Sequence, residues 1–418
     1  MARLLEKPYK VGESLKELTQ NLSFPGLTTG LIGATFSASV GLGIIISVAK
    51  DGKLPDALAI SWIFAVFLFG GLATTVISTL YRTPVVIAWS IPGAVLIGKY
   101  LTSGGTIYQA AGTYIVIAIV VLILTATGAI KKLIDHIPVP IMLGMVGGVL
   151  LSYGIGAFAN GMKVPAVYGV MVLVFFVWQF FRSLSSKIPS VVVAAIVGII
   201  MLKVMGMTKS VPITWAIASP VFITPQFSLS SLLTLGVPLF FMVVGVQNIQ
   251  AIGVLLSRDY KPPVNAIFAF PSVMTFFNAI MGGHTAVTAG PSTAIVSSDL
   301  AGPKEYRWIA AFFEGIFWVI VALLVKVGVD AAKMVPAEFM TVVAGLAMFD
   351  VFISAFEGAF SKKFRKGAMA AFFISAANIS LFNVGAPFWA IIGGVLASAI
   401  TEHKDFVQNK PQVEQKAA

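Results

Sequence analysis

The sequence predicts an all-α polytopic membrane protein with 14 spans, arranged as two seven-span repeats of inverted topology. Three observations predict this fold class. Hydrophobic residues make up 58% of the 418-residue chain and charged residues only 11%, whereas an average soluble domain carries roughly 25% charged residues. Apolar runs of membrane length recur along the chain, and basic residues favour alternate loops between them. The composition excludes a soluble enzyme, and the absence of cysteine excludes disulfides and thiolate metal sites.

The expected spans follow a polar, basic segment, residues 1–24, which lacks the small-residue cleavage site of a signal peptide. A helix needs about 20 apolar residues to cross the hydrocarbon. Runs near that length cover residues 27–49, 56–80, 84–101, 107–129, 138–159, 164–182, 188–206, 228–256, 263–282, 284–299, 307–328, 336–358, 367–382 and 384–401. Residues 25–206 then form the first repeat, residues 207–402 the second, and residues 403–418 a cytoplasmic tail.

The third and tenth spans differ from ordinary helices in the same way. Thr83–Ile97 and His284–Ser298 each begin with β-branched residues and then reach a proline, Pro92 or Pro291. Proline suits the first turn of a helix and disfavours helix before it. Each span is therefore expected to be a short strand followed by a half-helix. Such irregular backbone is tolerated at membrane depth only where protein or a watery cavity satisfies it.

Two short sequence echoes support the repeat. PGAVLI (92–97) is similar to PSTAIV (291–296) in spans three and ten, and GLGIII (41–46) is similar to AIGVLL (251–256) in spans one and eight. Because seven is odd, two consecutive copies insert with opposite topology. Broken helices at matching positions of inverted repeats are typical of secondary transporters with a site near the bilayer midplane.

The net charge of +11 has an explanation in membrane orientation and does not require nucleic-acid binding. With the N-terminus placed in the cytoplasm, 20 of the 28 Lys and Arg residues fall in inside segments and 8 in outside segments. The positive-inside rule therefore predicts a multi-pass protein of the cell membrane with both termini in the cytoplasm.

Two acids lie well inside predicted helices, away from the helix ends: Glu314 in span eleven and Asp350 in span twelve. Ionisable groups at membrane depth are costly and are therefore functional candidates. Either carboxyl is a candidate proton carrier, because burial brings its protonation towards physiological pH. The alternative is a polar group that reaches the interface or bonds a neighbouring helix.

His284 begins the second broken span. An imidazole at a broken helix suits a proton switch or an anion donor, and the alternative is a structural histidine with both nitrogens bonded. No set of metal-ligating residues accompanies it, so no metal site is expected.

The half-helices that begin near the two prolines are expected to direct free backbone N–H groups at a cavity. Such N-termini favour an anion such as a carboxylate. Pro291, Ser292 and Thr293 stand at one mouth, and Trp89 and Ser90 flank the other. The indole of Trp89 is a candidate stacking surface for a planar ring, with simple packing as the alternative.

Span eight carries three carboxamides, Gln247, Asn248 and Gln250, within an apolar helix. Such groups avoid lipid. The i,i+3 spacing places Gln247 and Gln250 on one face, with Asn248 to the side. Thr35 and Ser37 of span one lie at the corresponding depth. We expect these residues to line a polar, uncharged pocket between spans one, three, eight and ten.

Several motifs resemble the BenE benzoate:proton symporter family. YRTPVVIAWSIPGA (81–94) is the most specific of them. QNIQAIGVL (247–255), YKPPV (260–264), GGHTAVTAGPSTAI (282–295) and GLA (345–347) follow in the order that the family shows. The resemblance extends from span one to span fourteen.

The resemblance implies the seven-plus-seven inverted-repeat fold shared with uracil permeases and with bicarbonate and sulfate transporters. In that fold, spans 1–4 and 8–11 form a core domain, spans 5–7 and 12–14 form a gate domain, and the site lies between them. The residues that match motif positions near that site are Trp89, Ser90, Gln247, Asn248, His284 and Thr285. Glu314 and Asp350 fall outside these motifs, so their proton role rests on their depth.

The resemblance also implies uptake of a small aromatic carboxylate such as benzoate together with a proton, across the bacterial inner membrane. Carboxamides stand where uracil permeases carry acids, which favours an anion over a nucleobase. The alternatives are a nucleobase:cation symporter, or an anion exchanger or channel of the same fold. No catalytic constellation, phosphate loop or ATPase domain is present, so neither an enzyme nor a cofactor is expected. The sequence leaves monomer and homodimer both open.

Overall fold

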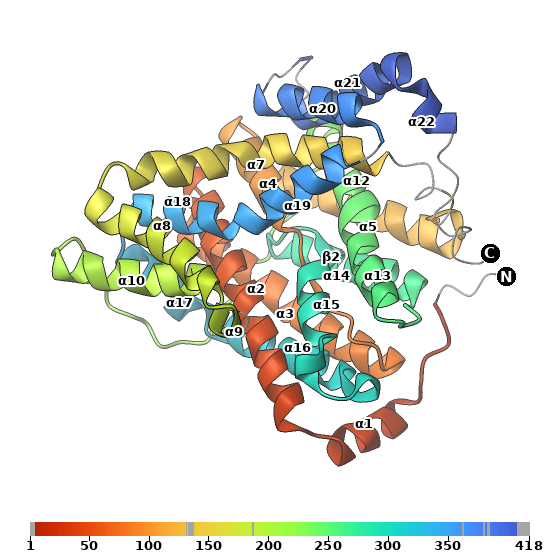
Figure 1. Ribbon diagram of the computed structural model, residues 1–418, viewed down its shortest axis with the longest axis horizontal. Helices are drawn as coiled ribbons and strands as arrows, with labels where there is room; N and C mark the ends of the chain where they lie inside the picture. The colour runs from red at the N-terminus through yellow and green to blue at the C-terminus, as the bar shows by residue number, and fades with distance from the viewer. Residues whose placement is uncertain are drawn as a thin grey trace.

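The protein is described here by a computed structural model that covers residues 5–130, 132, 138–185, 188–361, 363–378, 381–382 and 385–407. Within these residues, seven helices are long and apolar enough to cross a membrane, and four further apolar helices are shorter. The helical membrane fold is thus confirmed, and the count of 14 spans stays a prediction. Figure 1 shows the helices surrounding a small central region of extended chain.

The first half of the chain contains α1 (Val11–Gln20), α2 (Phe24–Asp51), α3 (Asp56–Tyr81), β1 (Ile87–Trp89), α4 (Ile91–Thr102), α5 (Ile107–Ala126), α7 (Val139–Gly161), α8 (Pro165–Phe180), α9 (Arg182–Ser185) and α10 (Ser190–Val204). Ser23 caps α2 by accepting a hydrogen bond from the Gly26 N–H at 3.2 Å. Thr106 and Gln109 form a reciprocal capping box at the start of α5. Local capping therefore fixes where these spans begin.

The second half begins with one long helical span, Leu229–Leu256. Its α-helical parts are α11 (Leu229–Ser231), α12 (Val237–Phe241) and α13 (Asn248–Ser257), and two π-helical stretches separate them. The π-helical stretches are η1 (Leu232–Gly236) and η2 (Met242–Gln247). The remaining elements are α14 (Val264–Ile280), β2 (Ala286–Thr288), α15 (Gly290–Val296), η3 (Asp299–Ala301), η4 (Lys304–Tyr306), α16 (Trp308–Leu323), α17 (Val325–Lys333), α18 (Ala337–Ala347), α19 (Phe349–Phe360), α20 (Arg365–Ala376), α21 (Ala386–Thr401) and α22 (His403–Val407).

Span eleven differs from the continuous helix that the sequence predicts, whereas span twelve nearly matches its prediction. Span eleven ends at Leu323, and α17 follows as a separate helix whose charged residues at 326, 330 and 333 disfavour the hydrocarbon. Span twelve has a local irregularity at Met348, between α18 and α19. The Met348 N–H still bonds the Ala344 carbonyl and the Met348 carbonyl accepts from the Phe352 N–H, so Ala337–Phe360 remains one long helix.

The two broken spans have the predicted form of a short strand followed by a half-helix. β1 and β2 pair antiparallel, with Ile87 opposite Thr288, Ala88 opposite Val287, and Trp89 opposite Ala286. The Ser90 N–H donates to the Thr285 carbonyl at 3.0 Å and continues the pairing beyond the strands. Because the strands are antiparallel, α4 and α15 leave the pair in opposite directions.

Side chains satisfy the backbone groups that face away from this pairing. The Thr74 hydroxyl accepts from the Ile87 N–H at 2.8 Å and donates to the Ile87 carbonyl at 2.9 Å. On the other strand, Thr275 accepts from the Ala286 N–H and Asn248 from the Thr288 N–H. All of these groups are buried. A buried backbone donor without a partner is costly, so these side chains make the extended segments stable.

Helix packing falls into two groups. One group holds the close pairs α3–α16, α2–α16 and α5–α14 around the strands, and the other holds α7–α20, α20–α21, α8–α10 and α7–α18. The two groups meet where α2 contacts α18 and α4 contacts α7. The boundaries of a core and a gate domain stay a prediction.

We predict that Thr74→Val destabilises the fold by about 1–3 kcal/mol, because it leaves the buried Ile87 N–H and carbonyl without their partner. The measurement is the free energy of unfolding of the purified protein in detergent. Thr79→Val is the matched control, because the Thr79 hydroxyl bonds only the Thr75 carbonyl of its own helix. Equal losses in both variants would contradict the role of Thr74.

Candidate functional site

A cavity of about 940 Å³ lies between the two groups of helices. One wall comes from α2, β1–α4, η2–α13 and β2–α15, and the opposite wall from α7, α8, α10, α18 and α19. Its volume is within the range of about 300–1,000 Å³ that is typical of small-molecule sites. The predicted pocket between spans one, three, eight and ten is therefore present, with a second wall from the other helix group.

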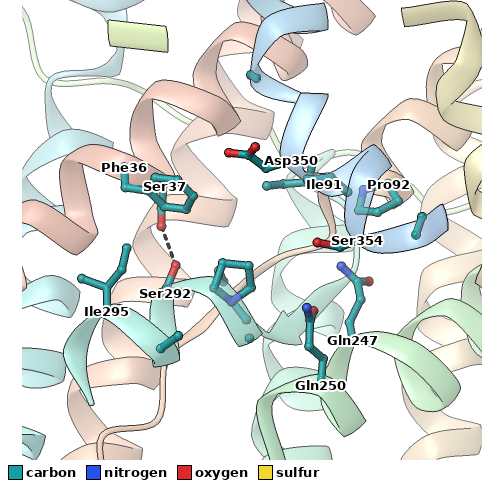
Figure 2. A pocket seen from close by; sticks show the side chains of 18 of the residues that line it. Phe36, Ser37, Ile91, Pro92, Gln247, Gln250, Ser292, Ile295, Asp350 and Ser354 are labelled. Carbon is teal, nitrogen blue, oxygen red and sulfur yellow. Dashed lines mark hydrogen bonds between the residues drawn. The ribbon is translucent and has the colours of Figure 1, made fainter. Parts of the chain in front are cut away.

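The first wall carries neutral hydrogen-bonding groups (Figure 2). The hydroxyls of Ser37 on α2 and Ser292 on α15 lie 2.7 Å apart. The side chain of Gln247 projects from the end of η2, and that of Gln250 projects from α13. The Ser90 hydroxyl donates to Gln247 Oε1 at 2.7 Å. Because Oε1 is occupied, the carboxamide NH₂ of Gln247 is left as a donor for a ligand.

The two half-helices begin at this wall. Pro92 and Pro291, each in the first turn of its half-helix, both line the cavity. Ser90 caps α4 by accepting from the Gly93 N–H at 3.0 Å, whereas α15 has no side-chain cap. The positive end of the α4 dipole thus lies beside the cavity, which favours an anionic ligand.

Trp89 adds an aromatic surface to the same wall. Its ring lies 4.2 Å from Phe67 and 5.0 Å from Trp318, measured between ring centroids. α2 passes close to the indole at Gly41, where an added Cβ would lie 2.4 Å from a ring carbon. Only glycine therefore allows α2 to approach Trp89 this closely.

His284 lies behind the wall with both ring nitrogens bonded. The Trp62 indole N–H donates to Nδ1 at 2.8 Å, so Nε2 carries the proton and donates to the Ser90 carbonyl at 2.9 Å. The side chain is fully buried. This arrangement corresponds to the structural alternative for His284, since it holds Ser90 in place for capping α4.

The structure separates the remaining sequence candidates into two sets. Those that line the cavity are Ser37, Trp89, Gln247, Gln250, Pro291, Ser292 and Asp350. Those that are buried behind the cavity wall are Ser90, Asn248, His284, Thr285, Thr293 and Glu314. Thr35 belongs to neither set, because it is exposed elsewhere on α2. As expected from their spacing, Gln247 and Gln250 share the cavity face and Asn248 turns aside to β2.

Glu314 is fully buried on α16, one side chain away from the cavity. Ser37 Oγ lies 3.5 Å from Glu314 Oε1, and Oε2 has no hydrogen-bond partner within the described residues. Gly33 makes room for the carboxyl, because a Cβ there would lie 2.4 Å from Oε2. Ser292, Ser37 and Glu314 therefore form a polar line from the cavity into the helix bundle.

Asp350 projects from the opposite wall, in the first turn of α19 (Figure 2). Ser354 lines the cavity one turn further along the same helix. Ser354 was not expected in the site, although its i,i+4 spacing from Asp350 places both on one helix face. Three more unexpected residues, Gln179, Ser185 and Ser190, line the cavity from the ends of α8, α9 and α10. These three lie at span ends, where polar residues carry no special signal. Among the described residues, no cluster of His, Asp and Glu is arranged to hold a metal ion.

We predict that Gly41→Ala displaces Trp89 and destabilises the protein by about 1–3 kcal/mol, as overpacking does in a dense interior. Thermal unfolding in detergent and tryptophan fluorescence provide the measurements. Gly43→Ala on the same helix is the control, because its new Cβ would lie at an ordinary 3.4 Å from Val343. An unchanged Gly41→Ala variant would show that Trp89 has room to move.

Comparison with known proteins agrees with this geometry. The BenE family, described as benzoate membrane transport protein, matches residues 20–400. The chain is 28% identical over 372 residues to the inner membrane protein YdcO of Escherichia coli K12, covering 88% of this chain and 94% of that protein. It is 29% identical over 385 residues to the benzoate membrane transport protein of Acinetobacter baylyi, covering 92% of this chain and 96% of that one.

Solved structures share the fold at low identity. The structure of SLC26A9 aligns with a TM-score of 0.59 and 14% identity, covering 94% of this chain and 66% of that one. The transmembrane domain of the cyanobacterial bicarbonate transporter BicA aligns with a TM-score of 0.59 and 12% identity, covering 90% and 97%. Because the family match covers nearly the whole chain, this protein belongs to the BenE family of benzoate membrane transport proteins and is a multi-pass membrane transporter rather than an enzyme.

Proposed function

We propose that this transporter takes up a small aromatic carboxylate, benzoate or a close relative, by proton symport through alternating access. The observation that supports this most directly is the composition of the cavity's first wall. Neutral hydroxyls of Ser37 and Ser292 lie at the start of α15, and the Gln247 carboxamide lies beside Ser90 at the start of α4. Trp89, although mostly buried, contributes to the apolar part of the lining. Such a wall matches a ligand with one carboxylate and one ring.

The cavity lining includes residues at or beside two loops. Ser185 lies between spans six and seven, with Pro189 just inside span seven, and Leu300 follows span ten, with Ser298 near the end of that span. Both loops are predicted to lie inside the cell by the distribution of Lys and Arg. We infer from this placement an inward-facing state, with both termini on the cytoplasmic side of the inner membrane. Uptake requires that the helix groups rock to an outward-facing state.

Three groups are the proposed proton carriers. Asp350 lines the cavity, and Glu314 lies behind the cavity wall, where it contacts the cavity residue Ser37. His284 has less support, because both of its nitrogens are bonded within the protein. The proton and the organic anion, together with the surrounding lipid, are the proposed partners, and a monomer and a homodimer are equally compatible with this function.

We predict that proteoliposomes containing the purified protein accumulate radiolabelled benzoate when an inward proton gradient is imposed. Dissipating the gradient with a protonophore should abolish accumulation, while exchange of internal for external benzoate continues. Equal uptake with and without the gradient would contradict symport and favour the exchanger or channel. Uracil competing more strongly than unlabelled benzoate would favour the nucleobase symporter.

We predict that Gln247→Glu weakens benzoate binding at least tenfold at neutral pH, because a carboxylate replaces the donor that faces the ligand's charge. Acidic pH should restore part of the affinity by protonating the new carboxyl. Isothermal titration calorimetry measures both. Gln247→Leu is the control: it also removes the donor, but the pH dependence of its weaker binding should match that of the unmutated protein, whereas Gln247→Glu should recover more affinity at acidic pH than either. A tight, pH-independent Gln247→Glu variant would place the ligand's carboxylate elsewhere.

A further inference from the structure

Asp350 is the one charged residue that lines the cavity, within the part of the chain that the structure describes. No Lys, Arg or His of that part contributes to the lining. The formal charge of the cavity therefore depends on whether Asp350 is protonated. When Asp350 is ionised, it carries a negative charge, as the proposed carboxylate substrate does.

The position of Asp350 leaves its carboxyl free to exchange a proton. The residue is exposed to the open cavity, and the described residues offer it neither a hydrogen bond nor an ion pair. Figure 2 shows the carboxyl across the cavity from the polar wall that carries Ser37, Ser292 and the two glutamines. It stands on the helix group opposite to the one that carries the donors.

Charged groups on neighbouring elements do not compensate Asp350. Of the elements packed against α19, α7 has no charged residue in its sequence, and α20 carries Arg365 and Lys366 in its first turn. α18 carries Glu338 at its opposite end, where it pairs with Lys163. Two further acids lie on nearby helices: Glu314 lies behind Ser37, and Glu357 lies two turns along α19 and is exposed. Asp350 thus faces the ligand space alone.

An ionised Asp350 and a bound carboxylate would repel each other. Both would occupy a cavity of about 940 Å³ with an apolar majority of lining residues, where screening by water is reduced. The neutral donors of the first wall suffice for one anionic charge. A second charge would have no counter-ion in the cavity.

We propose that Asp350 links the proton to the substrate by carrying the cavity's single negative charge whenever the substrate is absent. The substrate anion binds when Asp350 is protonated, and the ionised Asp350 takes over the same charge after release. The proton that Asp350 accepts outside leaves it inside, so one proton accompanies each anion. This inference rests on the proposed function and identifies its coupling residue on the wall opposite to the donors.

The same charge balance explains why transport is coupled. The loaded carrier, with protonated Asp350 and one anion, has the same cavity charge as the empty carrier with ionised Asp350. Both states can therefore close and reopen. The carrier with an anion and ionised Asp350 has one negative charge too many, and the empty carrier with protonated Asp350 has one too few to balance the positive end of the α4 dipole.

The test uses Asp350→Asn in the full-length protein, with benzoate as the probe. In the unmutated protein the dissociation constant should rise about tenfold per pH unit where Asp350 loses its proton, since one proton is linked to binding. In Asp350→Asn the affinity should be independent of pH. Proteoliposomes of this variant should keep benzoate exchange and lose accumulation driven by a proton gradient, because its empty cavity has no negative charge.

Two controls isolate the effect. Glu357→Gln makes the equivalent change on the same helix outside the cavity and should keep the pH dependence of the unmutated protein. Asp350→Glu keeps a carboxyl at the same position and should also keep the pH dependence. If Asp350→Asn keeps the normal pH slope or the gradient-driven accumulation, the inference is wrong while the proposed function stands. If the unmutated protein neither binds nor transports benzoate, the proposed function fails, and this inference with it.

Discussion

The structure depends on satisfying the backbone of two extended segments in the middle of an apolar bundle. A helix satisfies its own backbone at membrane depth, but a strand needs outside partners. β1 and β2 meet half of this need by pairing with each other. Thr74, Thr275 and Asn248 meet the other half from the helices that surround the strands. The interruption of two spans is thus compensated locally, and it places two helix beginnings in the interior.

The ligand site is a consequence of that arrangement. Where the strands end, α4 begins beside the cavity, and Ser90 caps it while Gln247 and His284 hold Ser90 from two sides. The wall so formed is rigid and neutral, with hydrogen-bond donors and a dipole in place of a cation. The opposite wall is built from other helices and brings Asp350 to the same space. Donors and charge are thus divided between two helix groups, which is the arrangement on which the proposed coupling of ligand occupancy to conformation rests.

Much of this could be anticipated from the sequence, for identifiable reasons. Pro92 and Pro291 restrict their own backbone and that of the residues before them, so strand and half-helix followed from local chemistry. The spacing of Gln247 and Gln250 predicted their common face, because helical periodicity holds over a few residues even where π-helical turns occur nearby. The local irregularity at Met348 was not predicted, since neither proline nor a strongly helix-breaking pair marks it. His284 illustrates the opposite case: its place in the chain suggested the cavity, but Trp62, which is 222 residues away in sequence, holds it behind the wall.

The sequence by itself determined the membrane environment, the broken spans and the family, because composition, proline restriction and motif order are properties of neighbouring residues. The tertiary structure alone decided which polar side chains share the cavity. Ser37 and Ser292 meet across 255 residues, and Asp350 reaches the same space from a third part of the chain. The physical reason is that long-range packing of helices, and not local periodicity, sets which helix faces turn towards each other. The short list of intramembrane acids came from the sequence, and their different positions, one in the cavity and one behind it, came from the fold.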